Sequence, residues 1–352
     1  MNIRELLQNV IDNQGSDLHL TVGAPPVVRI DGKLRPIEGQ DPLTPTDVEN
    51  LVFSILSAEQ KEMLIMNKEL DFSFAYGDVA RFRVNAFHQR GYLAAALRLI
   101  PFKIPTLEEL NLPASLYDFG LLPQGFVLIT GPTGQGKSTT IAALLNYINE
   151  SRNLHIVTIE DPIEYIYPHR KSLVDQRELH LDTHSWEIAL RSVLRQDPDV
   201  VLIGEMRDYE TISSAITIAE TGHLVFASLH TNSAAQTIDR IIDVFPENQQ
   251  RQVRVQLSSI LEGVISQRLV PAIGGGRVPV VEIMKASPAV RTVIREGKTH
   301  QLDNIVATSL ELGMISLDRA LAQSVKDGLV EEAVARSQTL HPEEFQRILR
   351  SI

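Results

Sequence analysis

The sequence has no cysteine, and it has no long apolar run. Without cysteine there can be no disulfide bond, no zinc site built from cysteines and no thiol nucleophile, which fits a reducing compartment. A membrane-spanning helix needs about 20 consecutive apolar residues, and no segment provides them. Residues 1–17 have the spacing of an amphipathic helix rather than the layout of a secretion signal. We therefore expect a cytoplasmic protein.

Positive charge is also scarce, because 33 Lys and Arg residues face 44 Asp and Glu residues, for a formal net charge of −11. Binding to nucleic acid or anionic lipid requires a basic surface, so we expect no nucleic-acid partner. The apolar share of 43% and the charged share of 22% are typical of a soluble globular protein. A chain of 352 residues predicts two domains.

The most informative stretch is residues 126–140, FVLITGPTGQGKSTT. An apolar run leads into a glycine-rich turn and a helical pattern follows, which is the context of a phosphate-binding loop. In such loops backbone N–H groups and the helix N-terminus bind phosphate oxygens, the lysine reaches the β- and γ-phosphates, and the serine ligates Mg²⁺. We therefore expect ATP and Mg²⁺ as cofactors, with Ser138 on the metal. The predicted nucleotide-binding residues are Gly131, Thr133, Gly134, Gln135, Gly136, Lys137, Ser138 and Thr139.

Residues 1–100 predict a small α+β domain around an antiparallel sheet. Alternating apolar residues and the turn pairs Asp31-Gly32 and Gly77-Asp78 indicate two hairpins, the first with a type I′ turn. Residues 46–66 have the pattern of one or two helices. The predicted strands are residues 27–30, 33–35, 71–76, 80–87 and 92–99.

Three prolines in residues 101–113 are typical of a linker, so we place a second domain at 114–352. Short continuous apolar runs in this domain predict a parallel sheet that is covered on both faces. Beyond residue 246 the pattern is mostly helical, with a hairpin around residues 274–276 and short helices over 316–352. Ser287-Pro288 begins one helix and Gly297 ends it. The apolar runs are residues 127–129, 156–159, 200–203 and 224–229.

Polar residues follow the predicted strands after the phosphate-loop strand, where ligands of open α/β sheets bind. Glu205 ends an acid–apolar–acid pattern, and we assign it the role of polarising the attacking water. Glu160 and Glu164 are candidates for the Mg²⁺ shell or for an auxiliary carboxylate. Glu160 and Glu205 would bind the metal ion through water. His230 is a candidate sensor of the γ-phosphate. His223 fits a catalytic histidine and a backbone-bonded structural one equally well.

Arginines of the first domain are candidates for stabilising the transferred phosphate. Arg81 and Arg83 alternate along one strand and so point to the same face. Arg98 lies on the next strand, and its face depends on the register. A solvated sheet face explains these arginines equally well.

Four segments together resemble the secretion ATPases of type II and type IV pilus systems: residues 131–140, 158–164, 197–208 and 219–231. Residues 15–20, 80–87 and 288–297 are similar to segments of the retraction ATPases of type IV pili. Gln135 stands where this family often has serine. Export and extension members usually carry a four-cysteine metal site, which this chain cannot form.

The resemblance implies an α/β fold with a PAS-like α+β domain before a RecA-like P-loop ATPase domain. It implies a homo-hexameric ring in which Arg81, Arg83 or Arg98 faces a neighbour's nucleotide. Domain closure driven by ATP would act on an inner-membrane platform protein, and the motor would retract pili and power twitching motility from the cytoplasmic face of that membrane. A second retraction ATPase would be a further partner.

Other functions stay open at this point. The chain fits an accessory retraction ATPase, or an assembly or export ATPase of a pilus or type II secretion system. A RecA-like nucleic-acid translocase shares the phosphate loop, but the net charge disfavours it. A nucleotide-driven switch without sustained turnover is disfavoured by the acidic residues that follow the strands.

Overall fold

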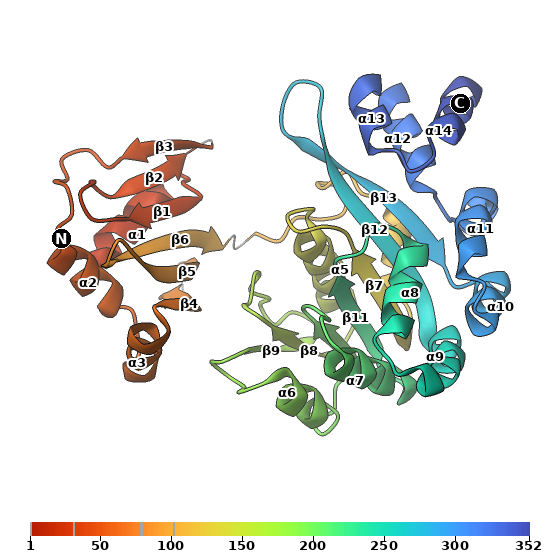
Figure 1. Ribbon diagram of the computed structural model, residues 1–352, viewed down its shortest axis with the longest axis horizontal. Coiled ribbons are helices and arrows are strands. Elements are labelled where there is room, and N and C mark those ends of the chain that lie inside the picture. Colours follow the sequence, from red (N-terminus) through yellow and green to blue (C-terminus); the bar gives the residue numbers. More distant parts are fainter. Residues whose placement is uncertain (1, 31, 78–79, 101–102) are drawn as a thin grey trace. The chain divides into compact units, whose positions relative to one another are not determined.

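The computed structural model describes residues 2–30, 32–77, 80–100 and 103–352. Contacts between residues divide the chain into two units. One unit comprises Met1–Lys103 with Pro162–Ile166, and the other comprises Ile104–Asp161 with Tyr167–Ile352. Each unit has its own sheet and helices (Figure 1).

The first unit is built on a six-stranded sheet whose order is β3-β2-β1-β6-β5-β4. All of its neighbouring strands pair antiparallel. The strands are β1 (Asp17–Leu20), β2 (Val27–Ile30), β3 (Lys33–Pro36), β4 (Glu69–Tyr76), β5 (Ala80–Gln89) and β6 (Tyr92–Ile100). The helices are α1 (Ile3–Asp12), α2 (Pro45–Phe53) and α3 (Ala58–Asn67).

Both predicted hairpins form, as β2–β3 and β4–β5. Asp31 and Asp78 of their turns lie outside the described residues, so the type I′ prediction is untested. The segment expected to hold one or two helices holds two, because residues 54–57 interrupt it and a second capping box restarts the helix. Thr44 with Asp47 begins α2, and Ser57 with Gln60 begins α3.

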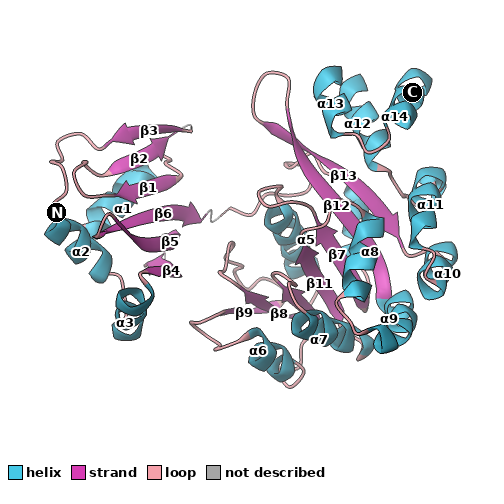
Figure 2. Cartoon of the chain, viewed as in Figure 1, coloured by secondary structure: helices cyan, strands magenta, loops and turns pink. Residues whose placement is uncertain are grey.

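The second unit is built on a seven-stranded sheet whose order is β13-β12-β7-β11-β10-β8-β9 (Figure 2). All neighbouring pairs are parallel except β12–β13, which form the expected hairpin around the three glycines. The strands are β7 (Gly125–Thr130), β8 (His155–Glu160), β9 (Leu173–Glu178), β10 (Val200–Ile203), β11 (Leu224–Leu229), β12 (Leu261–Pro271) and β13 (Arg277–Lys285).

Helices pack against this sheet and continue beyond it to the C-terminus. The α-helices are α4 (Tyr117–Gly120), α5 (Lys137–Ser151), α6 (Trp186–Val193), α7 (Tyr209–Glu220), α8 (Ala234–Asp243), α9 (Glu247–Ile260), α10 (Pro288–Glu296), α11 (Leu302–Thr308), α12 (Leu317–Lys326), α13 (Glu332–Gln338) and α14 (Pro342–Ser351). Short 3₁₀ helices cover η1 (Ala114–Leu116), η2 (Thr299–Gln301) and η3 (Leu310–Leu312). As predicted, Ser287 caps the start of α10 and Gly297, with a φ of 71°, caps its end.

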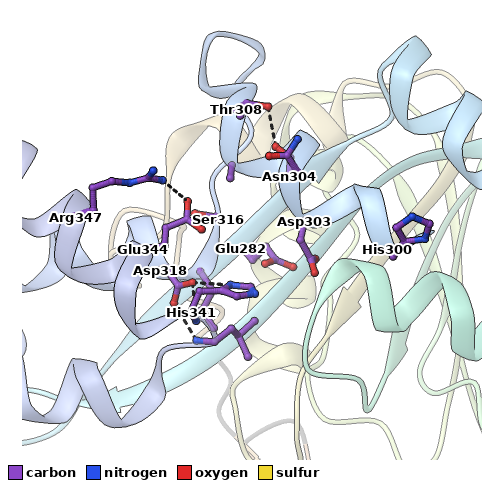
Figure 3. Close-up of a pocket in the computed structure, with 13 residues that line it drawn as sticks. Glu282, His300, Asp303, Asn304, Thr308, Ser316, Asp318, His341, Glu344 and Arg347 are labelled. Atoms are coloured by element: carbon purple, nitrogen blue, oxygen red, sulfur yellow. Dashed lines mark hydrogen bonds and ion pairs between the residues drawn. The ribbon is translucent and has the colours of Figure 1, made fainter. Parts of the chain in front are cut away.

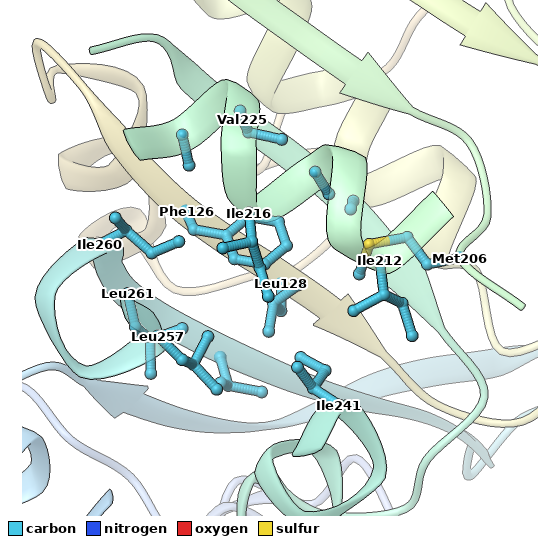
Figure 4. Packing of buried hydrophobic residues seen from close by; sticks show 14 of the residues in the cluster. Phe126, Leu128, Met206, Ile212, Ile216, Val225, Ile241, Leu257, Ile260 and Leu261 are labelled. Atoms are coloured by element: carbon cyan, nitrogen blue, oxygen red, sulfur yellow. The ribbon is translucent and has the colours of Figure 1, made fainter. Parts of the chain in front are cut away.

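The main core of the second unit lies on one face of the sheet (Figure 4). Alternate residues of β7, such as Phe126 and Leu128, meet Ile216 of α7 and Leu257 of α9 in this core. The central strands β7, β10 and β11 are buried at every position. Since parallel strands covered on both faces have no solvent side, these strands read as continuous apolar runs in the sequence.

The C-terminal helices form a smaller core on the β12–β13 hairpin. Val270 and Val280 of the strands pack with Leu321 of α12 and Phe345 of α14. Among the described residues, no helix combines the length and the apolar character that crossing a membrane requires.

Candidate active site

The phosphate loop joins the end of β7 to the start of α5, as the sequence predicts. Gly136 is the N-cap of α5 and has a φ of 80°, which favours glycine. Gly131 lies so close to β12 that an added Cβ would meet the carbonyl oxygen of Gln267 at 2.3 Å. The motif glycines therefore give the backbone both the turn and the close approach that this loop needs.

Lys137, the first residue of α5, lies within this loop and is buried. Its Nζ donates to the carbonyl oxygens of Gly131, at 2.8 Å, and Pro132, at 3.1 Å. These bonds hold the ammonium group where the loop backbone and the N-terminus of α5 converge. A phosphate bound there would meet a positive charge and helix N–H groups together.

Glu205 and His230 follow neighbouring strands and lie next to Lys137. Nε2 of His230 is 3.0 Å from Oε1 of Glu205, and its Nδ1 is 3.4 Å from Nζ of Lys137. Because an ammonium group can only donate, Nδ1 acts as the acceptor and Nε2–H donates to Glu205. The histidine thus connects the carboxylate to the lysine at the phosphate loop.

The backbone fixes the position of Glu205. The Ser228 hydroxyl donates to the carbonyl oxygen of Gly204 at 2.5 Å, and Met206 N donates to the carbonyl oxygen of Ser228 at 3.0 Å. Both residues that flank Glu205 are therefore bonded to the adjacent strand β11. The side chain consequently extends from a rigid part of the sheet.

Arg207 forms a bidentate ion pair with Glu205, with N–O distances of 2.7 and 2.8 Å. Partial burial by itself would raise the pKa of the Glu205 carboxyl. The hydrogen bonds from Arg207, with nearby His230 and Lys137, outweigh this effect and hold the pKa below its usual range. Glu205 is therefore ionised at neutral pH. Arg207 lies within the segment 197–208, but no pattern in the sequence assigns it a role.

Glu160 ends β8 and is buried at the same edge of the sheet. Its Oε1 accepts hydrogen bonds from the Thr158 hydroxyl, at 2.7 Å, and from Gln176 Nε2, at 3.2 Å. Ser138 lies in the first turn of α5 and is partly buried. Glu164 is exposed and belongs to Pro162–Ile166, which the contacts group with the first unit. The role of Glu164 therefore stays a prediction.

His223 directly precedes β11, at the amino end of that strand and so opposite to the end that carries His230. Its Nδ1 is 3.0 Å from both the carbonyl oxygen of Ile218 and the hydroxyl of Thr221. These contacts join it to the end of α7, so the geometry favours the structural alternative for this histidine.

The three candidate arginines share one face of the first unit's sheet. Arg83 is directly opposite Arg98 in the β5–β6 register, and Arg81 lies two residues along β5. Each is bonded within its own unit: Arg81 to Ser73, Arg83 to Asp71 and Arg98 to Asp17. The register that the sequence left open is thereby fixed.

A separate polar pocket lies beside the C-terminal helices (Figure 3). Its volume is about 390 Å³, and Asp318, His341 and Glu344 are close enough together to suggest a metal site. Both carboxylate oxygens of Asp318, however, accept hydrogen bonds from the residues that lead into α14, including the backbone N–H groups of Leu340 and His341. Asp318 therefore holds the turn before α14.

The chain resembles known proteins over almost its whole length. Residues 2–275 match the family model described as type II/IV secretion system protein. The chain belongs to the type II/IV secretion system protein family. Within this family it is 49% identical to the type IV pilus retraction ATPase PilT of Pseudomonas aeruginosa, over 98% of this chain and 100% of that protein. It is also 41% identical to the type IV pilus ATPase PilU of the same organism, over 96% and 89% of the two chains.

A solved structure of the pilus retraction motor PilT with bound ADP superposes with a TM-score of 0.92. The identity is 47%, and the match covers 99% of each chain. The predicted fold class is confirmed, with an α+β domain before a P-loop ATPase domain of the type II/IV secretion family. The prediction of an ATPase is confirmed as well.

Proposed function

We propose that this chain is the motor that retracts type IV pili, and that it uses ATP hydrolysis at the phosphate loop. The observation that carries the proposal is the full-length likeness to the retraction ATPase PilT, in sequence and in fold. The chain of contacts from Lys137 through His230 to Glu205 supports hydrolysis, since it joins a phosphate-binding lysine to an ionised carboxylate.

In this proposal each part of the site has one role. The loop residues Thr133, Gly134, Gln135 and Thr139 surround the phosphates with Lys137, and Glu205 orients and polarises the attacking water. His230 senses the γ-phosphate, because it bridges Glu205 and Lys137 and also lies 3.4 Å from the Thr133 hydroxyl.

The oxygen donors at this edge of the sheet fit Mg²⁺, a cation that prefers hard oxygen ligands. Ser138 would hold it directly, while Glu160 and Glu205 would do so through water. When bound with ATP, the ion would neutralise part of the negative charge of the phosphates. Glu164 stays a candidate auxiliary carboxylate only if the segment 162–166 reaches the nucleotide.

The working assembly in this proposal is a ring of six copies. Residues 1–100 and 114–352 act as two domains joined by 101–113, of which 101 and 102 lie outside the described residues. Arg81, Arg83 or Arg98 of one copy faces the nucleotide of the next, where a guanidinium would stabilise the transferred phosphate. The ring acts on an inner-membrane platform protein at the cytoplasmic face of the membrane.

The test is Glu205→Gln in the native host. We expect purified Glu205→Gln to bind ATP but not to hydrolyse it, and we expect cells to carry more surface pili and lose twitching. Glu210→Gln is the matched control, because it makes the same change at an exposed residue of α7. Sustained hydrolysis by Glu205→Gln would refute the role of Glu205. Fewer pili would instead mean that the motor drives assembly or export.

The likeness to PilU favours a second candidate, an accessory retraction ATPase that works beside a main motor. A main motor retracts pili without another retraction ATPase, whereas an accessory one needs the main motor beside it. In a host that lacks every other retraction ATPase, a main motor should still restore twitching, whereas an accessory one should not.

A further inference from the structure

Strand β12 contributes a residue to the phosphate loop that no motif in the sequence identifies. Because β12 runs parallel to β7, with Ser266 opposite Thr130, the next residue, Gln267, lies beside the start of the loop. Gln267 is only 2% exposed. Its Nε2 donates to the carbonyl oxygen of Gln135 at 2.7 Å, and its Oε1 accepts from the Thr140 hydroxyl at 2.6 Å. One side chain thus joins the loop to the first turn of α5.

Gln135 makes the reciprocal contact. Its Oε1 accepts a hydrogen bond of 2.6 Å from the backbone N–H of Leu269 on β12. The side chain of Gln267, on β12, therefore binds the loop and α5, and the side chain of Gln135, in the loop, binds the backbone of β12. We call Gln135 and Gln267 the glutamine clamp.

Two motif glycines also depend on the position of Gln267. A Cβ on Gly131 would lie 2.3 Å from its carbonyl oxygen, and a Cβ on Gly136 would lie 2.9 Å from its Nε2. Both ends of the loop therefore pack against the same residue. A shift of Gln267 would move the backbone groups that receive the phosphates.

We propose that the glutamine clamp holds the phosphate loop in its phosphate-binding conformation and thereby sets the affinity for nucleotide. A glycine-rich loop loses much conformational entropy when it becomes ordered, and a loop that is already ordered avoids this cost on binding. Gln135 and Gln267 are positioning residues, because their side chains bind the loop, α5 and β12. The hydrogen bonds of both glutamines go to the loop backbone, Thr140 and β12, so we expect the clamp to change nucleotide binding more than the hydrolytic step.

The test uses the full-length protein and three variants: Gln267→Leu, Gln135→Ala and the double variant. The measurements are the Kd for ADP and the KM and kcat for ATP hydrolysis, at a temperature well below the thermal midpoint of every variant. Ser266→Ala is the matched control. Ser266 is buried on the same strand, and its hydroxyl bonds with Thr130 of β7 instead of the loop.

Gln267→Leu should raise the Kd and the KM about tenfold, since it removes two buried hydrogen bonds, and kcat should stay within about twofold. Gln135→Ala should raise both constants about threefold. The double variant should raise the Kd by less than the product of the two single-variant increases, because both substitutions act on the same loop. Ser266→Ala should bind ADP as the wild type does.

Two results would overturn the proposal. One is an unchanged Kd in Gln267→Leu with a reduced kcat, and the other is a Kd that Ser266→Ala changes equally. If Gln267→Leu does not fold, Gln135→Ala tests the proposal, because Gln135 is only partly buried. An unchanged Kd in Gln135→Ala would then refute the clamp. The inference rests on nucleotide binding and not on pilus retraction, so binding and pilus counts test the two separately.

Discussion

Replacing Glu282 by Gln should stabilise the second unit at neutral pH and leave it nearly unchanged in acid. Glu282 lies on β13, is 5% exposed, and accepts a hydrogen bond of 2.7 Å from the backbone N–H of Ala234. Burial, with smaller contributions from Asp303 and Asp318, outweighs the backbone hydrogen bonds and raises the pKa of its carboxyl from the usual 4.5 to about 7. The carboxyl is therefore protonated in the folded chain at pH values where it ionises in the unfolded chain.

The sign and size of the effect follow from these two pKa values. Well below the unfolded pKa, both states bind the proton, so the group does not alter the free energy of unfolding. Between pH 4.5 and about 7 only the unfolded state loses the proton, so stability falls as the pH rises. Each unit of pKa difference corresponds to about 1.4 kcal/mol, so the full loss is about 3 kcal/mol near pH 8. Glu282→Gln cannot ionise and should avoid this loss.

The assay is urea unfolding from about pH 5 to about pH 8, followed by the fluorescence of Trp186. This residue is the only tryptophan, and it packs against the main core of the second unit. Glu282→Gln should exceed the wild type by less than about 1 kcal/mol at the acid end and by about 3 kcal/mol at the alkaline end. Glu311→Gln, at an exposed position, is the control. A stability difference between wild type and Glu282→Gln that does not grow with pH would refute the reasoning.

Two further predictions test the site and the core. Arg207→Ala should raise the pKa of Glu205, so the acid limb of the pH profile of kcat/KM should move to higher pH; an unmoved limb would mean that Arg207 does not set this pKa. Gly263→Ala should lower the free energy of unfolding of the second unit by about 1–3 kcal/mol, because its Cβ would meet the ring of Phe119 at 2.3 Å. The same Trp186 fluorescence assay measures this loss, and wild-type stability would mean that the ring moves aside.

The central strands of the second unit could be predicted from sequence because burial on both faces leaves an apolar run. Strand β9 was not predicted, since it lies at the edge of the sheet and carries polar residues such as Asp175 and Gln176. The long strands β12 and β13 were predicted only as a hairpin around their glycines. Edge strands and hairpins depend on partners that are distant in the sequence, so local patterns describe them less well.

The site could be predicted where chemistry and position coincide in one motif. Lys137, Glu205 and His230 follow strands whose carboxyl ends meet at one edge, and the structure brings them together. Gln267 could not be predicted, because a single glutamine on a strand carries no signal until the register of β12 against β7 is known. Glu160 lies at the same edge, whereas Glu164, four residues later, belongs to a segment with different contacts.

The arginine face shows how register changes a functional hypothesis. Sequence placed Arg81 and Arg83 together but not Arg98, and the pairing of Arg83 with Arg98 now puts all three on one face. Arg83 is bound through two nitrogens to Asp71, whereas Arg98 binds Asp17 through Nε and has a side chain that is 73% exposed. Asp17 would keep the Ser16 hydroxyl, at 2.7 Å, and Arg29, at 3.6 Å, if Arg98 moved. Because the Arg98 side chain lies mostly in solvent and Asp17 keeps these two partners, we expect Arg98 to be the arginine that reaches a neighbour's phosphate.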